Sequence, residues 1–327
     1  MRRLAQATAA VLIALPFGAL ADPLPSWNAT DAEAAITGFV ERVTDPRSPD
    51  FVPEAERIAV FDNDGTLWSE KPLYFQGLFA LDELRAKAKA DPAILDTDVL
   101  RAANAGDMKT VMASGSKGLL EILDVSHANV SVDAFKTEAR DWLTTARHPT
   151  SGLTYAEMTY QPMLELLVYL RDNGFKTYIV SGGGVDFIRA ISAEAYGVPT
   201  WQVIGSEGET KYEVADGVPV LMKEGGASFI DDKTGKPVGI DRFIGQRPIF
   251  AAGNSDGDLQ MLEYTTAGSG PRFGMIVHHT DAKREFAYDR DSEVGRLSEA
   301  LDAAPGHGWL VVDMAKDWGR IWSGEKP

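Results

Sequence analysis

FDNDGTLWSE, residues 61–70, is the stretch around which this chain of 327 residues is organised. The apolar run at 58–61 is typical of a buried strand, and it stops at the polar, turn-forming residues 62–66. Ligands bind at the carboxyl ends of strands in open α/β sheets. Asp62 and Asp64 are therefore candidates to hold a divalent cation, with one carboxylate free to transfer protons. A turn without chemistry is the alternative, because Asp, Asn and Gly dominate turns for local reasons.

The first 21 residues have the pattern of a secretory signal peptide. Arg2 and Arg3 precede an apolar stretch at 9–20, and Ala19 and Ala21 are small residues at the positions that a signal peptidase reads. The stretch is shorter than the roughly 20 residues that span a bilayer. We therefore expect residues 1–21 to be cleaved, no membrane association afterwards, and a location in a bacterial periplasm.

Composition narrows the classes of partner. The net charge is −16, and it becomes −18 without residues 1–21, which contain two arginines and no acids. Such an acidic chain is not expected to bind nucleic acid or an anionic membrane. There is no cysteine, which excludes disulfides, a thiol nucleophile and cysteine-ligated zinc. The composition gives no indication of an oligomeric state.

The residue pattern divides the chain into a core and an insert. After a helix at 32–43 and the strand at 58–61, helices are predicted at 78–89, 91–104, 119–124 and 132–146, the last with Ser131 as its N-cap. Beyond them we predict helices at 163–173 and 281–291, strands at 176–180, 248–252, 273–277 and 310–313, and a hairpin or excursion within 205–240. The sequence therefore predicts an α/β core at 22–72 and 160–327, with a helical domain inserted at 73–159. The core would be a three-layer, Rossmann-like parallel sheet.

Two later strands also end in groups that suit phosphate chemistry. The strand at 176–180 leads into Ser181 and three glycines, whose hydroxyl and flexible amides before a helix suit an anion. The strand at 248–252 leads into GNSDGD, residues 253–258, which brings further carboxylates to a strand end. Gly-rich turns are common, and an EF-hand-like calcium loop is an alternative for the acidic stretches. Neither stretch has the acid at the twelfth position that such a loop requires.

These motifs, in this order over roughly residues 57–279, resemble the haloacid dehalogenase-like (HAD) superfamily. The resemblance is to its phosphatases of the phosphoserine phosphatase-like subgroup, which carry a helical cap at the position of this insert. It implies that Asp62 is the nucleophile that forms an aspartyl phosphate and that Asp64 is the general acid and base. It also implies phosphate contacts from Thr66, Ser181, Gly182 and a lysine, and a Mg²⁺ ion held by Asp62, the backbone carbonyl of Asp64, Asp258 and Asn254.

Two positions stay open within this resemblance. For the lysine we choose Lys236, because it opens the segment that leads to the strand at 248–252, with Lys233 and Lys223 as alternatives. Asn254 replaces the first of the two acids in the family's metal-binding motif, which removes one negative charge from the site. Asp256 is the alternative source of the missing carboxylate.

We therefore predict a Mg²⁺-dependent phosphomonoesterase that acts on a small phosphorylated metabolite, such as phosphoserine or phosphorylcholine. Trp68 is a candidate aromatic contact for an organic cation, and Glu70 is a candidate partner for a substrate ammonium. Asp64 favours phosphate esters over the haloacids of a dehalogenase, because the dehalogenases have no use for a second aspartate. A non-catalytic periplasmic binding protein on the same fold is a further alternative.

Overall fold

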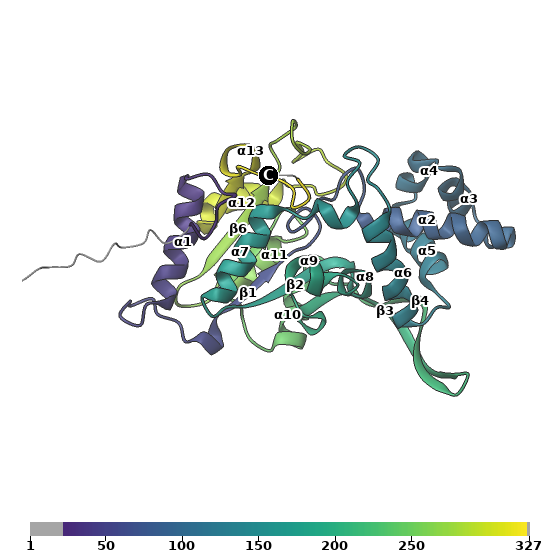
Figure 1. Cartoon of the computed structure of the whole chain (residues 1–327), viewed down its shortest axis with the longest axis horizontal. Helices are drawn as coiled ribbons and strands as arrows, with labels where there is room; N and C mark the ends of the chain where they lie inside the picture. The colour runs from purple at the N-terminus through teal and green to yellow at the C-terminus, as the bar shows by residue number, and fades with distance from the viewer. Residues whose placement is uncertain (1–21, 326–327) are drawn as a thin grey trace, which may run out of the picture.

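The computed structural model describes residues 22–325, so the predicted signal peptide at 1–21 lies outside the described residues. A seven-stranded sheet in the order β4-β3-β2-β1-β5-β6-β7 forms the centre of the molecule (Figure 1). Its strands are β1 Ile58–Phe61, β2 Lys176–Gly184, β3 Val203–Ala215, β4 Val218–Phe229, β5 Phe250–Gly253, β6 Phe273–His278 and β7 Leu310–Asp313. All neighbouring pairs are parallel except β3 and β4, which form an antiparallel hairpin. The predicted α/β fold is confirmed, with an antiparallel edge strand added.

Helices cover both faces of the sheet, because the side chains of each strand alternate between the faces. Ala59 and Phe61 of β1 belong to one buried cluster, and Ile58 and Val60 belong to another. The first cluster includes residues of α1 Asp31–Thr44, α7 Gln161–Asp172, α8 Val185–Arg189, α9 Ser192–Tyr196 and α13 Met314–Asp317. The second includes residues of α10 Gly235–Ile244, α11 Leu259–Thr266 and α12 Glu299–His307. The core therefore has three layers.

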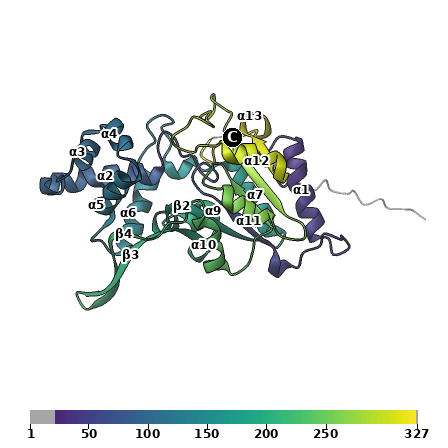
Figure 2. The same cartoon turned by 180° about the vertical axis from the view of Figure 1, so that it is seen from behind.

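Five helices between β1 and α7 form the helical insert. They are α2 Phe75–Ala90, α3 Asp98–Ala105, α4 Met108–Ala113, α5 Gly115–His127 and α6 Val132–Thr145. Figure 1 shows them at one end of the molecule, and Figure 2 shows the same separation from behind. Much of α2 to α5 packs around a separate buried cluster, to which Val294 of the core also belongs. The boundaries 73–159 of an inserted domain stay a prediction.

The β3–β4 hairpin joins the core to the insert. The backbone of Lys223 on β4 exchanges hydrogen bonds of 2.9 Å with Asn129 and Val130, which lie between α5 and α6. The N–H of Gly226 donates to Asp124 Oδ1 at 2.8 Å. The segment predicted as a hairpin or excursion within 205–240 is therefore a hairpin, and it packs against the helical insert.

Two predicted helices differ from the structure for local reasons. The helix predicted at 91–104 is broken into a 3-10 turn at Pro92–Ile94 and α3, which begins where Thr97 Oγ1 accepts a hydrogen bond from the N–H of Leu100. The segment 281–291 contains no helix. Its Asp281 Oδ1 accepts hydrogen bonds from the N–H groups of residues 283 and 284, which closes a turn instead.

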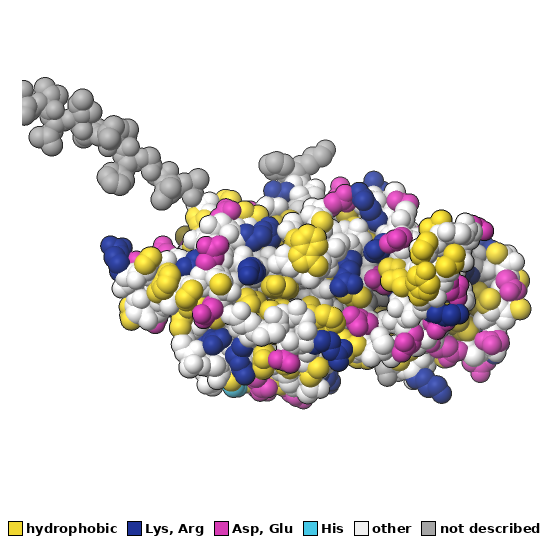
Figure 3. Space-filling view, turned by 90° about the horizontal axis from the view of Figure 1, so that it is seen from below, with side chains coloured by type: hydrophobic (Ala, Val, Ile, Leu, Met, Phe, Trp, Pro, Cys, Tyr) yellow, Lys and Arg dark blue, Asp and Glu magenta, His cyan; other side chains and the backbone are white. Residues whose placement is uncertain are grey.

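No helix within residues 22–325 is long and apolar enough to cross a membrane. On the face seen from below, acidic and basic side chains are interspersed over both the core and the helical insert (Figure 3).

Candidate active site

The site is built where the carboxyl ends of β1, β2 and β5 meet at one edge of the sheet. β1 lies between β2 and β5, and open α/β sheets bind ligands where the strand order reverses in this way. Asp62 directly follows β1 and is buried. Its backbone N–H donates to the carbonyl of Ala252 on β5 at 2.9 Å. The sheet itself therefore fixes the position of the first carboxylate.

The backbone conformation of the loop after β1 requires a glycine at position 65. The carbonyl of Asn63 accepts hydrogen bonds from the N–H groups of residues 66–68, which closes a tight turn. Gly65 has a φ of 75°, and a Cβ there would lie 2.1 Å from Asn254 Nδ2. Glycine alone tolerates both this left-handed backbone and this close approach.

The carboxylate of Asp64 lies beside the glycines of β2. Its Oδ1 accepts a hydrogen bond from Trp68 Nε1 at 2.8 Å, and a Cβ on Gly183 would lie 3.2 Å from its Oδ2. Burial raises the pKa of Asp64 to about 6, and the hydrogen bond from Trp68 opposes this rise because it stabilises the charged form. A carboxyl group with such a pKa can release and accept a proton near neutral pH.

Lys236, in the first turn of α10, brings an ammonium group between two carboxylates. Its Nζ donates to Asp62 Oδ1 at 2.6 Å, to Asp258 Oδ1 at 2.5 Å and to the carbonyl of Val180 at 2.9 Å. Burial lowers the pKa of Lys236, but the two carboxylates outweigh this effect and the net shift is upward. The ammonium is therefore charged and fully hydrogen-bonded inside the protein.

The other two lysines considered from the sequence lie elsewhere. Lys233 is exposed to solvent. Lys223 Nζ contacts Asp186 Oδ2 at 2.6 Å, on the hairpin side of the site. Of the three, Lys236 is the one whose ammonium contacts Asp62.

The carboxylates of the site outnumber its ammonium group, which fits a divalent cation. Burial raises the pKa of Asp62 well above its usual range, and repulsion from Asp258 adds to the rise. Among the hydrogen bonds of residues 22–325, Asp62 uses its Oδ1, which leaves its Oδ2 available to a metal ion. Oxygen ligands and excess negative charge suit Mg²⁺. No three His, Cys, Asp or Glu side chains in the described part of the chain already surround a common metal position, so this fit rests on the donor chemistry.

The side chains of Asn254 and Thr66 are hydrogen-bonded to each other. Thr66 Oγ1 donates to Asn254 Oδ1 at 3.1 Å, and Asn254 Nδ2 donates to Glu70 Oε1 at 2.7 Å. The N–H groups of Asn254 and Ser255 each donate to Asp258 Oδ2 at 3.0 Å. The two side chains thus connect the loops after β1 and β5. The sequence predicted Asn254 as a metal ligand and Thr66 as a phosphate contact.

Asp256 does not supply the missing carboxylate. Its Oδ1 accepts hydrogen bonds from the N–H groups of Ser298 at 2.9 Å and Ala300 at 3.0 Å, at the start of α12. A carboxylate is favourable there, because the first N–H groups of a helix lack partners within the helix. The alternative that the sequence left open is therefore excluded by the position of this side chain.

The glycines after Ser181 extend β2 instead of forming a turn. β2 continues to Gly184, and its register with β3 shifts between Ser181 and Gly184. Ser181 is buried, and its Oγ accepts a hydrogen bond from the N–H of Gly183 at 3.1 Å. Gly182 and Gly183 line the cavity described below, so their backbone meets the ligand space where the sequence predicted an anion site. Glycine permits this irregular strand because it has no side chain to accommodate.

Trp68 is buried in the core, whereas Glu70 lines the cavity and is hydrogen-bonded to its neighbours. Trp68 is 1% exposed, and its ring lies 5.1 Å from that of Phe75 and 6.0 Å from that of Phe187. Glu70 is also 1% exposed, and its Oε1 accepts a hydrogen bond from the hydroxyl of Tyr288 at 2.7 Å. Burial raises the pKa of Glu70 well above its usual range, which disfavours the charged form that an ammonium needs. Trp68 therefore packs in the core, and Glu70 connects the loop after β1 to Asn254 and Tyr288 through hydrogen bonds.

His279 and Glu285 contribute to the site although the sequence pattern did not indicate them. His279 Nε2 lies 2.7 Å from the carbonyl of Gly65, and its Nδ1 lies 3.2 Å from Glu285 Oε2. Glu285 Oε1 accepts hydrogen bonds from Ser69 Oγ and Tyr160 Oη, both at 3.0 Å. These buried groups hold the loop after β1 from behind. The contact between His279 and Gly65 spans 214 residues, so no local spacing could reveal it.

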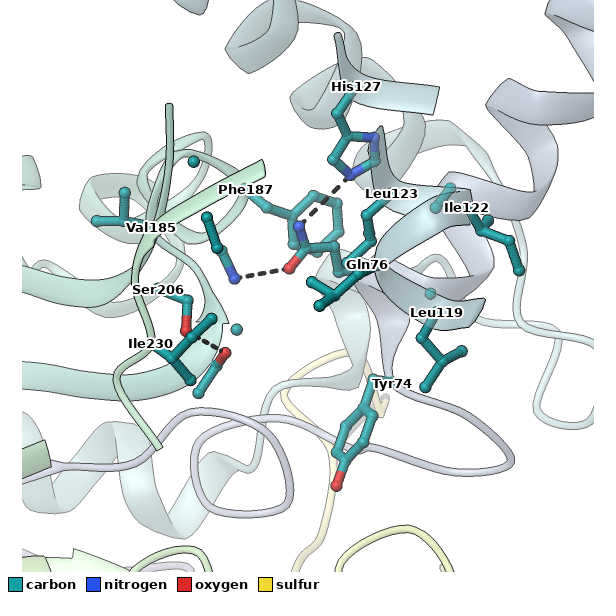
Figure 4. A pocket seen from close by; sticks show the side chains of 18 of the residues that line it. Tyr74, Gln76, Leu119, Ile122, Leu123, His127, Val185, Phe187, Ser206 and Ile230 are labelled. Atoms are coloured by element: carbon teal, nitrogen blue, oxygen red, sulfur yellow. Dashed lines mark hydrogen bonds between the residues drawn. The ribbon is translucent and has the colours of Figure 1, made fainter. Parts of the chain in front are cut away.

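A cavity of about 480 Å³ extends from the site toward the helical insert. Asp62, Asp64 and Lys236 line it at the sheet end. Figure 4 shows the side chains of α5 on one side of this cavity and those near the ends of β2 and β3 on the other. Gln76 lies between them, and its Oε1 accepts a hydrogen bond from the N–H of Gly184 at 2.7 Å. The arrangement suits an anionic group at the sheet edge with its remaining part under the insert.

The chain was compared with curated proteins, solved structures and family models. A comparison with curated proteins finds no match. Among solved structures, a conserved functionally unknown protein from Anaerococcus prevotii DSM 20548 is 14% identical, with a TM-score of 0.56 over 89% of this chain and 94% of that chain. A protein with unknown function from Bordetella pertussis Tohama I is 19% identical, with a TM-score of 0.48 over 79% and 99% of the two chains. A phosphoserine phosphohydrolase-like protein from Francisella tularensis subsp. tularensis SCHU S4 is 20% identical, with a TM-score of 0.37 over 68% and 87%.

The first of these likenesses supports the fold alone. The family model of the haloacid dehalogenase-like hydrolases matches residues 59–263, which is more than half of the chain. The matched range contains the ends of β1, β2 and β5 and therefore the site built on them. The chain belongs to the haloacid dehalogenase-like hydrolase family.

Proposed function

We propose that this hydrolase is a Mg²⁺-dependent phosphomonoesterase that works through an aspartyl phosphate on Asp62. The observation that carries the proposal is the Lys236 ammonium, which bonds Asp62 and Asp258 at 2.6 and 2.5 Å at the end of a cavity that Asp64 also lines. A nucleophilic carboxylate, a cation beside it and a second acid with a raised pKa are the groups that phosphoryl transfer in two displacements requires.

In the first displacement, an oxygen of Asp62 attacks phosphorus and the bond from phosphorus to the leaving oxygen breaks. Lys236 favours the ionised, nucleophilic form of Asp62 against the burial that raises its pKa. Asp64, with a pKa of about 6, donates its proton to the leaving oxygen, so an alcohol departs rather than an alkoxide.

In the second displacement, Asp64 accepts a proton from the water that attacks the aspartyl phosphate. The bond between phosphorus and the Asp62 oxygen breaks, inorganic phosphate leaves, and both carboxyl groups return to their starting states. Gly182 and Gly183 line the cavity on the β2 side, where their backbone would border the phosphoryl group. A Mg²⁺ ion held by Asp62, the backbone carbonyl of Asp64 and Asp258 would offset the negative charge of the carboxylates and the phosphoryl oxygens, and it would leave the carboxyl group of Asp64 free for proton transfer.

The test is steady-state hydrolysis of an aryl phosphate by residues 22–327, with Mg²⁺ or with EDTA, for the wild type and Asp62→Asn. We expect Mg²⁺-dependent turnover that Asp62→Asn lowers by at least about 10³-fold, because the substitution removes the nucleophile. Asp98→Asn is the matched control, since Asp98 lies on α3 with a side chain 94% exposed.

Turnover that survives Asp62→Asn would contradict the aspartyl-phosphate mechanism. Turnover of equal rate in EDTA would contradict the metal requirement. If the wild type hydrolyses no phosphate ester but releases halide from haloacids, the chain is a dehalogenase. If it does neither, the reading as a non-catalytic binding protein replaces the proposal.

A further inference from the structure

The cavity has two chemically different ends. The sheet end carries Asp62, Asp64 and Lys236. The wall formed by the helical insert is aliphatic and comes from three of its helices, with Leu81, Met108, Val111, Leu119, Ile122 and Leu123 among the lining side chains. Figure 4 shows Leu119, Ile122 and Leu123 side by side along α5. Small-ligand sites have volumes of about 300–1,000 Å³, so a cavity of about 480 Å³ holds more than a phosphate group.

Lys223 of the hairpin and Asp124 of the insert both line the cavity, and both already have partners. Lys223 is paired with Asp186 at 2.6 Å, and their side chains are only 11% and 12% exposed. Asp124 Oδ1 accepts a hydrogen bond from the N–H of Gly226. A charged group on a substrate would therefore have to compete with a partly buried ion pair or with a backbone hydrogen bond.

His127 is also unsuited to binding a charged group. Its Nε2 lies 3.4 Å from Gln76 Nε2, and its Nδ1 lies 2.8 Å from Ser126 Oγ. Burial lowers the pKa of His127 to about 3, so the ring is neutral. Glu207, Glu224 and Asp232 line the opposite side of the cavity, where they are partly or fully exposed to solvent.

We propose that the substrate is a phosphate monoester of an alcohol with an aliphatic hydrocarbon chain, which lies against α2, α4 and α5 while the phosphate meets Asp62 and Lys236. This inference rests on the proposed phosphatase function and names the leaving group. Binding of the hydrocarbon chain is favourable, because it removes the apolar surfaces of both the chain and the cavity from water. A phosphorylcholine or phosphoserine head group would instead bring a charge against the aliphatic side chains of the insert, and burying a charge against apolar surface is unfavourable.

The test measures kcat/KM for n-alkyl phosphates from ethyl to decyl below their micellar concentrations, beside phosphorylcholine and phosphoserine. Each buried methylene should raise kcat/KM by about fourfold until the cavity is filled. In Leu119→Gln and Leu123→Gln, the ratio of the decyl to the ethyl kcat/KM should fall by about tenfold, because a polar side chain replaces apolar surface that the longer chain would contact. Leu221→Gln is the matched control, because Leu221 lies on β4, is 52% exposed and is not among the cavity-lining residues.

The outcomes separate this inference from the proposed function. The proposal of an aliphatic substrate is overturned if kcat/KM is constant or falls with chain length, or if it is higher for phosphorylcholine or phosphoserine. Hydrolysis of any of these esters would still support the phosphatase function. If no ester is hydrolysed, the phosphatase function fails. Calorimetric titration of the wild type with decyl and ethyl phosphate then decides the inference, which equal affinities would overturn.

Discussion

Replacing Lys236 by Met should destabilise the metal-free protein strongly. The side chain is 2% exposed, and Lys236→Met would leave Asp62 and Asp258 buried without the ammonium that now contacts both. Removing one partner of a buried ion pair costs about 3–5 kcal/mol, because the remaining charge is uncompensated. At roughly 2–4 °C for each kcal/mol in a large domain, the melting temperature should fall by about 6–20 °C.

The loss should also depend on pH in a defined direction. Without Lys236, the folded-state pKa of Asp62 rises further above its unfolded value. A raised folded pKa contributes stability that is present at low pH and is lost as the pH rises through it. The difference between wild type and variant should therefore be greatest above neutral pH and shrink toward pH 4, as the carboxyl groups take up protons.

Thermal unfolding followed by circular dichroism in EDTA, at pH 5 and pH 8, measures both effects. Lys233→Met is the matched control, since it removes the same charge from an exposed side chain three residues away and should change the melting temperature little. A melting temperature of Lys236→Met that equals that of Lys233→Met at pH 8 would refute this reasoning.

Two further predictions concern other buried acids. Trp68→Phe removes the hydrogen bond that lowers the pKa of Asp64. The alkaline limb of the pH profile of kcat/KM should therefore move to higher pH by up to about one unit. An alkaline limb at the wild-type position would contradict the role of Asp64 as the general acid. Burial raises the pKa of Asp231 to about 7, so its ionisation costs the folded protein up to about 4 kcal/mol above that pH. In urea unfolding, Asp231→Asn should be more stable than wild type at pH 8 and equal to it near pH 4, whereas a pH-independent difference would contradict this origin.

The strand ends of the site could be read from the sequence because they are local features. The apolar run at 58–61, followed by Asp62, predicts a strand and a polar end without any tertiary information. The same holds for β5, and the carboxyl ends of parallel strands meet at one edge of a sheet. Lys236 was chosen on chain order, and its ammonium does contact Asp62.

The partner of each polar atom could not be read in this way. Asn254 lies in the expected motif, but its carboxamide bonds Thr66 and Glu70, which are far from it in the sequence. Asp256 differs from Asp258 by two positions, yet it caps α12 while Asp258 bonds Lys236. Spacing alone does not distinguish these carboxylates, because the direction of each side chain depends on the backbone of the loop and on α12.

The sequence by itself determined the α/β class, the helical insert and the three strand ends that carry the chemistry, because backbone propensity and hydrophobic period act over a few neighbouring residues. Only the tertiary structure decided that His279 and Glu285 hold the loop after β1 and that Trp68 belongs to the core. It also decided that the space beside Asp64 is walled by aliphatic side chains of the insert. These properties arise from contacts between segments that lie far apart in the chain, and such contacts exist only once the sheet, the hairpin and the insert have packed together.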